Sequence, residues 1–162
     1  MADSIKKVLL LLMVVGIVIN ISIISFLLFD LQPRLGGAAA LEPTVEVILY
    51  AGELEVDGGL AYGFGLSPDE ISSPGPDLEF KQGDVVRFII RNVGEIPHNF
   101  AIVRAVDPLN PDIVDDYQTP NINSNEEIAI VVQFNQVGEL QYQCTVPGHS
   151  DLGMWGNITI SP

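Results

Sequence analysis

The chain has 162 residues, which leaves room for one globular domain of ordinary size after a long apolar segment at its N-terminus. The formal net charge of −14 at pH 7 argues against nucleic acid as a partner, because phosphate groups attract basic surfaces. A single cysteine excludes an internal disulfide bond, so core packing and any bound metal must stabilise the domain.

Residues 1–30 are predicted to anchor the chain in a membrane. The 22 residues from Val8 to Phe29 carry no charge, and about 20 apolar residues are enough to cross a bilayer as a helix. Two lysines precede this segment and Asp30 follows it, so the positive-inside rule places the N-terminus in the cytoplasm and the remaining chain outside. The alternative is a signal peptide cleaved near Ala38–Ala40, although the apolar part of a signal peptide has only about 7–15 residues. Both alternatives place the rest of the chain on the extracytoplasmic side.

Residues 31–43 are predicted to be a flexible linker. They contain a Gly-Gly pair followed by three alanines, with a proline near each end and no hydrophobic periodicity. The remaining residues, 44–162, are expected to form one domain.

From Thr44 onward the sequence has the pattern of short β-strands. Val45 to Leu49 reads as a first strand, and Val56 to Gly59 reads as a hairpin turn. A second turn at Lys81 to Asp84 leads into the strand Val85 to Asn92, whose alternate apolar residues should face a core.

Further alternating apolar runs follow, and they are separated by turn signals. They cover residues 98–103, 126–134, 140–144 and 154–160. The segment Asp107 to Asn125 is rich in proline, aspartate and asparagine and is predicted to be a long loop, with Ile113 to Tyr117 as the place for a short helical turn. Several short strands joined by turns predict an all-β protein with two packed sheets.

The only cysteine, both histidines and one methionine form a candidate metal site. Cys144, His149 and Met154 are separated by four residues each in a loop rich in proline and glycine, and His98 begins an upstream apolar run. Any one of them alone could be an ordinary core or turn residue. Together, a thiolate, two imidazoles and a weak thioether are the ligands of blue copper electron-transfer sites. We therefore predict one copper ion held by His98, Cys144, His149 and Met154.

Two motifs around these ligands resemble those of a known family. Pro-His-Asn-Phe surrounds His98, and Tyr-x-Cys-x-Val-Pro-Gly-His-x4-Met-x-Gly runs from Tyr142 to Gly156. Over residues 44–162 the chain resembles the small blue (type 1) copper proteins, the cupredoxins. The gaps on both sides of His149 are most similar to those of auracyanin, rusticyanin and archaeal sulfocyanin. The resemblance implies a Greek-key β-sandwich with the copper at one end.

The resemblance also implies roles for residues near the ligands. Asn99 is expected to hold the Cys144 loop in place by hydrogen bonds. His149 is expected to lie near the surface and to serve as the electron port, surrounded by an apolar ring of Pro97, Val146, Pro147, Leu152 and Trp155.

The predicted function is electron transfer and not enzymatic catalysis. We expect a membrane-anchored carrier that shuttles single electrons between respiratory or photosynthetic partners, such as a cytochrome or an oxidase or reductase complex. The acidic surface would steer it toward a basic docking surface, although solubility or a saline or acidic habitat explains the charge equally well. The alternatives are a copper subunit fixed in a larger oxidoreductase complex and a copper storage or delivery protein.

Other copper and zinc sites fit the sequence less well. A binuclear copper site needs two cysteines in its loop, and a multicopper oxidase needs more histidines than this chain has. Catalytic zinc requires an open coordination position, and a methionine ligand points to copper.

Overall fold

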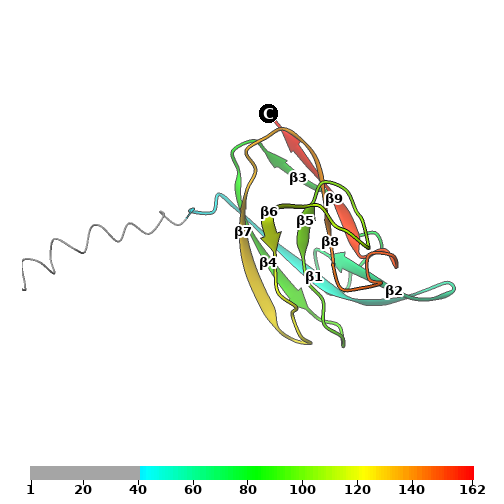
Figure 1. Cartoon of the computed structure of the whole chain (residues 1–162). Coiled ribbons are helices and arrows are strands. Elements are labelled where there is room, and N and C mark those ends of the chain that lie inside the picture. The colour runs from blue at the N-terminus through cyan, green and yellow to red at the C-terminus, as the bar shows by residue number, and fades with distance from the viewer. Residues whose placement is uncertain (1–40) are drawn as a thin grey trace, which may run out of the picture. The chain divides into compact units, whose positions relative to one another are not determined.

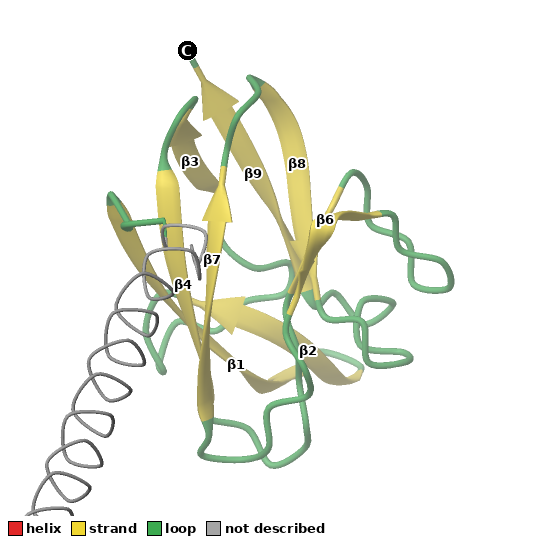
Figure 2. Cartoon of the chain, turned by 60° about the vertical axis from the view of Figure 1, so that its left-hand side comes forward, coloured by secondary structure: helices red, strands yellow, loops and turns green. Residues whose placement is uncertain are grey.

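The computed structural model describes residues 41–162. The predicted anchor, residues 1–30, and most of the predicted linker lie outside the described residues. Residues 41–162 form one compact unit of strands and loops, without a helix (Figure 1, Figure 2). Within this part of the chain, accordingly, no helix is long and apolar enough to cross a membrane.

The described residues form two β-sheets. The strands are β1 (Val45–Val56), β2 (Gly59–Gly65), β3 (Leu78–Lys81), β4 (Val85–Asn92), β5 (Ala101–Val103), β6 (Ile113–Gln118), β7 (Glu127–Gln133), β8 (Gly138–Gln143) and β9 (Trp155–Ser161). One sheet has the strand order β2-β1-β4-β7, and the other has the order β3-β9-β8-β5-β6. The pairs β1–β4 and β3–β9 are parallel, and the remaining pairs are antiparallel. Buried side chains from both sheets form one core, so the predicted all-β sandwich is confirmed.

Strand β4 illustrates how the sequence pattern produces this packing. Val86, Phe88 and Ile90 are fully buried, whereas Arg87 and Arg91 face the solvent side and pair with glutamates on the neighbouring strands β1 and β7. Side chains alternate between the two faces of a strand. The predicted inward face of this segment is therefore confirmed.

The first two strands form a hairpin whose turn extends beyond the rest of the sandwich (Figure 1). Val56 pairs with Gly59, and Gly58 and Gly59 have φ values of 113° and 141°. Such positive φ values favour glycine, which has no Cβ. The hairpin turn predicted for this segment is therefore present.

The segment between Asp107 and Asn125 differs from its prediction. Instead of a helical turn, Ile113–Gln118 is strand β6, the edge strand that pairs with β5. Asp115 and Asp116 have φ values of 47° and 58°, in the left-handed region that aspartate tolerates better than most residues. The ladder between β5 and β6 is irregular. The sequence of this strand, with two adjacent aspartates, also has no alternating apolar pattern by which it could have been recognised.

A cluster of four fully buried aromatic rings lies in the core next to the ligand-bearing segments. The ring centroids of Phe100 lie 6.2 Å from Phe64, 5.0 Å from Phe88 and 5.6 Å from Tyr142. Phe100 follows His98 by two residues, and Tyr142 precedes Cys144 by two. Because side chains two residues apart share a face of an extended segment, the same packing that buries these rings directs the two ligand side chains inward.

Candidate metal centre

The structure brings His98, Cys144 and His149 together in one buried cluster. The Nδ1 atoms of the two histidines are 3.1 Å apart, and Cys144 Sγ lies 3.5 Å from His149 Nδ1. All three ligand atoms lie within 4.8 Å of one another. The side chains of His98 and Cys144 are fully buried, and His149 is 5% exposed. Residues 46 positions apart in the chain thus meet as the sequence predicts.

Different elements hold the three side chains. His98 precedes β5, and its backbone is fixed by paired hydrogen bonds with Ile122 (3.1 and 2.7 Å). Cys144 follows β8, and its N–H donates to the carbonyl of Met154 at 3.0 Å. His149 lies in the loop between β8 and β9, where its carbonyl accepts the N–H of Met154 at 3.0 Å. The sheets and the loop therefore fix the backbone at each of these three residues.

Met154 is fully buried beside this cluster. It lies one residue before β9 and belongs to the same core as Cys144. Its backbone groups bond to both Cys144 and His149. The fourth predicted ligand thus lies in the segment that closes the ligand loop.

Asn99 connects the two ligand-bearing segments. Its side-chain oxygen accepts the N–H of Thr145 at 2.7 Å, and its amide nitrogen donates to Asn121 Oδ1 and Thr145 Oγ1 at 3.0 Å each. Its backbone N–H donates to Cys144 Sγ at 3.4 Å. The hydrogen-bonding role predicted for Asn99 is confirmed.

The protonation of the three side chains is set mainly by burial. Burial raises the pKa of the Cys144 thiol, and hydrogen bonds from the N–H groups of Asn99 and Val146 partly oppose this rise. Burial and repulsion from the His149 charge lower the pKa of His98 to about 4, against a weaker upward effect of Glu53. Burial likewise lowers the pKa of His149. At neutral pH both imidazoles are uncharged, which is the form that binds a metal.

This donor set fits copper. It combines one sulfur and two imidazole nitrogens with a buried methionine, all enclosed by core residues. The sequence-based choice of these ligand types therefore agrees with their arrangement in space, and a trigonal His2Cys set with a weak methionine is the blue copper arrangement.

Two residues that contact the site were not predicted from the sequence. Tyr62, on β2, stacks on the imidazole of His149 with ring centroids 4.1 Å apart and an angle of 17° between planes. Glu53, on β1, has a carboxylate oxygen 3.6 Å from His98 Nε2. Local spacing gave no signal for either contact, because β1 and β2 lie far from the ligand motifs in sequence.

The surroundings of His149 differ from the expectation of a surface histidine. Tyr62 covers its ring, and the N–H of Tyr62 donates to the carbonyl of Leu152 in the ligand loop at 3.3 Å. Of the predicted apolar ring, Pro97, Pro147 and Leu152 are exposed, whereas Val146 and Trp155 are half-buried. An aromatic ring from β2 therefore covers one face of the imidazole, in addition to the residues of the predicted apolar ring.

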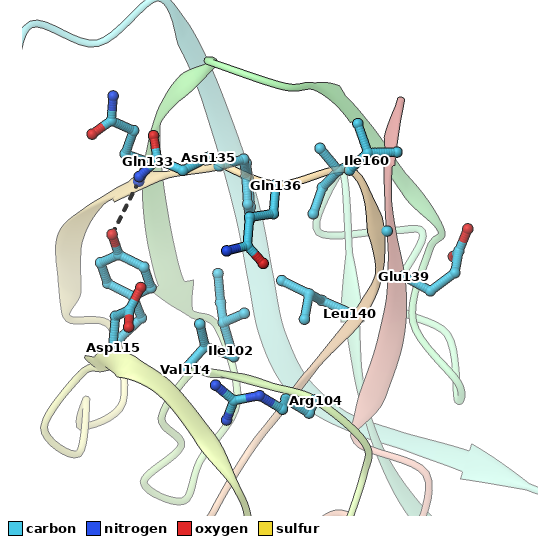
Figure 3. A pocket seen from close by; sticks show the side chains of 14 residues that line it. Ile102, Arg104, Val114, Asp115, Gln133, Asn135, Gln136, Glu139, Leu140 and Ile160 are labelled. Carbon is cyan, nitrogen blue, oxygen red and sulfur yellow. Dashed lines mark hydrogen bonds between the residues drawn. The ribbon is translucent and has the colours of Figure 1, made fainter. Parts of the chain in front are cut away.

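A pocket of about 360 Å³ lies at the end of β8 that is away from Cys144 (Figure 3). Ile102, Arg104 and Leu140 line it, and the hydroxyl of Tyr117 accepts the N–H of Gln133 there at 3.3 Å. None of the four predicted copper ligands borders it. This pocket is therefore separate from the metal centre.

Comparison with known proteins identifies the family. Residues 72–161, more than half of the chain, match the model of copper binding proteins of the plastocyanin/azurin family. The copper-resistant cuproprotein CopI of Vibrio cholerae is 26% identical over 93 residues, which cover 52% of this chain and 55% of CopI. The chain thus spans about half the length of the curated relative it matches.

Solved structures share the fold at low sequence identity. Auracyanin B has a TM-score of 0.56 and 20% identity, over 78% of this chain and 96% of auracyanin B. Rusticyanin from Thiobacillus ferrooxidans has a TM-score of 0.55 and 21% identity, over 74% and 79% of the two chains. Copper nitrite reductase from Nitrosomonas europaea is also similar, with a TM-score of 0.57 and 24% identity over 74% of this chain and 42% of the reductase. The fold alone thus occurs in enzymes as well as in small copper proteins.

The buried His-Cys-His cluster, the two-sheet sandwich and the match over residues 72–161 lead to the same result. The chain belongs to the plastocyanin/azurin family of copper-binding proteins.

Proposed function

We propose that the protein is a membrane-tethered blue copper electron carrier. The observation that supports this function best is the buried cluster of His98, Cys144 and His149, whose ligand atoms all lie within 4.8 Å of one another. In this proposal His98 and His149 would hold copper through Nδ1 and Cys144 through Sγ, and Met154 would add a weak thioether ligand. Bound copper supplies the one-electron Cu(I)/Cu(II) couple.

The surrounding chain is suited to keep the ligands in place when the oxidation state changes. Asn99 links the His98 segment to the Cys144 loop through hydrogen bonds to Thr145 and to the thiol, and its amide nitrogen also donates to Asn121. Core packing encloses the ligands and excludes water. A site that rearranges little on reduction and oxidation loses little energy to reorganisation, because its groups are already oriented.

The surface formed by β1, β2 and the loop at Glu95 and Ile96 is proposed as the docking surface for redox partners. A hollow of about 380 Å³ there is lined by three glutamates, by Tyr62 and by apolar residues, and none of its lining residues is basic. Tyr62 contacts both this hollow and the imidazole of His149. A partner protein with lysine or arginine on its docking surface, such as a cytochrome or an oxidase or reductase complex, would match this charge.

The location of the protein is proposed from the N-terminal sequence. The uncharged segment Val8 to Phe29 and the lysines before it favour a single membrane span with a cytoplasmic N-terminus. Residues 44–162 would then act on the extracytoplasmic side, in a respiratory or photosynthetic chain.

A role in copper storage or delivery is the second candidate. It is favoured by the relatives from Vibrio cholerae and Rubrivivax gelatinosus, both named copper-resistant cuproproteins. Against it stands the full burial of Cys144 and Met154, because a protein that hands over its metal needs ligands that an acceptor can reach.

Copper retention and electron exchange distinguish the two candidates. The copper-loaded full chain is cycled with small one-electron reductants and oxidants, and its Cu(I) form is then challenged with an excess of a Cu(I) chelator. A carrier cycles repeatedly and keeps its copper on the timescale of many cycles. Rapid loss of Cu(I) to the chelator, with slow electron exchange, would overturn the carrier function in favour of delivery.

A further inference from the structure

One nitrogen atom of the metal centre lacks a hydrogen-bond partner. Among buried side-chain nitrogen and oxygen atoms in residues 41–162, only His98 Nε2 is unpaired. The other ring nitrogen of His98, Nδ1, lies 3.1 Å from His149 Nδ1 and belongs to the ligand cluster. A buried polar atom without a partner is costly. The environment of Nε2 therefore requires an explanation.

The carboxylate of Glu53 is the group that faces this nitrogen. Its Oε1 atom lies 3.6 Å from His98 Nε2, and the Glu53 side chain is 19% exposed. An imidazole that binds a metal through Nδ1 carries its proton on Nε2. An Nε2–H group would then have a carboxylate oxygen within 3.6 Å as its nearest acceptor.

Glu53 is itself held in place by the loop that leads to His98. The N–H of Glu95 donates to both carboxylate oxygens at 3.2 and 3.0 Å, and the N–H of Ile96 donates to Oε1 at 3.0 Å. Gly94 leaves the space that the carboxylate occupies, because a Cβ on Gly94 would collide with Oε2. The loop thus fixes the carboxylate beside the histidine.

A glutamate carboxylate is ordinarily ionised at neutral pH, and that of Glu53 already accepts hydrogen bonds from two backbone N–H groups. A carboxylate has lone pairs for about four hydrogen bonds, which leaves acceptor capacity for His98 after the loop N–H groups are bound.

We propose that Glu53 is a positioning residue of the copper site, which accepts the Nε2–H of His98 and places a negative charge next to the metal. The inference rests on the ligand assignment of the proposed function. A carboxylate bonded to a ligating histidine fixes its tautomer and orientation and raises its basicity. The added negative charge stabilises Cu(II) relative to Cu(I), and so lowers the reduction potential.

The residues matched by the family model do not include Glu53. The match covers residues 72–161, whereas Glu53 lies on β1. The four proposed ligands therefore belong to the matched segment, whereas the carboxylate beside His98 comes from β1, which lies outside that segment.

The first test is the reduction potential of two charge-matched variants of the copper-loaded full chain. Glu53→Gln removes the carboxylate that faces His98, and Glu55→Gln removes the same charge from an exposed residue two positions along β1. We expect Glu53→Gln to shift the equilibrium toward Cu(I) about tenfold, which for one electron is a rise of about 59 mV. Glu55→Gln should change the potential much less. Equal shifts in both variants would overturn the proposal.

The second test needs no substitution. In the diamagnetic Cu(I) form of the wild-type chain, proton NMR should show the Nε2–H of His98 far downfield and protected from exchange with water. A signal that exchanges as fast as a free imidazole N–H would overturn the proposal. This measurement also decides the question if Glu53→Gln does not fold.

The tests separate this inference from the proposed function. If the wild-type chain shows the thiolate–copper colour but the two variants behave alike, only the role of Glu53 fails. If the wild-type chain binds copper without that colour, the ligand assignment fails, and the role of Glu53 fails with it.

Discussion

At the residue scale, the chemistry of the site depends on what surrounds each ligand. Burial keeps both imidazoles uncharged and raises the pKa of the Cys144 thiol, so a proton must leave the thiol when copper binds. Hydrogen bonds from two backbone N–H groups stabilise the sulfur as a thiolate. The ligands are thus prepared for a metal that binds thiolate strongly.

Asn99 provides a stability prediction. Asn99→Ala removes the acceptor of the part-buried Thr145 N–H and the donor to the exposed Asn121 side chain, so the Thr145 N–H loses its partner. We expect the free energy of unfolding of the copper-free protein to fall by about 1–3 kcal/mol, measured by urea denaturation. Asn121→Ala, which removes an exposed partner of the same network, should cost clearly less. Equal losses would mean that Asn99 does not hold the two segments together.

Met154 provides a prediction for the potential. Met154→Gln replaces a weak thioether with an oxygen donor that favours Cu(II), so the colour should remain while the reduction potential falls. A fall of about 59 mV corresponds to a tenfold change in the Cu(I)/Cu(II) equilibrium. Voltammetry of the variant and the wild type measures the difference. An unchanged potential would show that Met154 is not the axial ligand.

The four proposed copper ligands could be chosen from the sequence because there were few candidates. The chain has one cysteine and two histidines, and each stands beside a distinctive motif. Glu53 and Tyr62 could not be predicted, because their contacts depend on packing against two distant loops: Glu53 faces His98, 45 residues further along the chain, and Tyr62 stacks on His149, 87 residues further along. Nothing in the local pattern indicates which end of a sandwich such side chains approach.

At the element scale, strands with regular alternation were predicted well and irregular ones were not. In β4, apolar residues alternate with arginines, and the face that carries the apolar residues is buried. β3 has only four residues and β6 contains two aspartates with positive φ, so neither gave a recognisable pattern. Both are edge strands of the same sheet, and an edge strand depends on pairing with one neighbour more than on its own sequence.

Strand β2 provides a prediction about access to the site. Tyr62→Ala removes the ring that stacks on His149, so the copper-loaded variant should exchange electrons several-fold faster with a small, uncharged redox reagent. Tyr62→Phe keeps the ring and should behave like the wild type. Stopped-flow absorbance measures the rates. If the alanine variant reacts no faster than the wild type, Tyr62 does not limit access to the imidazole.

At the scale of the whole molecule, acidic residues dominate the surface. From Thr44 onward there are 18 aspartates and glutamates and only four basic residues, Lys81, Arg87, Arg91 and Arg104. Three of these four are paired with carboxylates. The hollow beside the metal centre therefore belongs to a surface of one sign, which suits the approach of a cationic partner.

Ionic strength tests this surface. The rate of electron transfer to a basic cytochrome should fall as salt is added, because salt screens charges over about 10 Å at 0.1 M. Replacing Glu55 and Glu95 with glutamine should reduce this dependence more than Asp116→Asn, which changes a charge on β6 outside the hollow. A rate that does not change with salt would favour solubility as the reason for the acidic surface.

The absorption spectrum of the oxidised, copper-loaded full chain tests whether one copper ion joins the thiol to both imidazoles. We expect an intense thiolate-to-Cu(II) charge-transfer band that disappears on reduction and returns on oxidation. Cys144→Ser should lose the band while its far-UV circular dichroism still shows the folded sandwich. A wild-type chain that binds Cu(II) without this band, or a serine variant that retains it, would contradict the copper site described above.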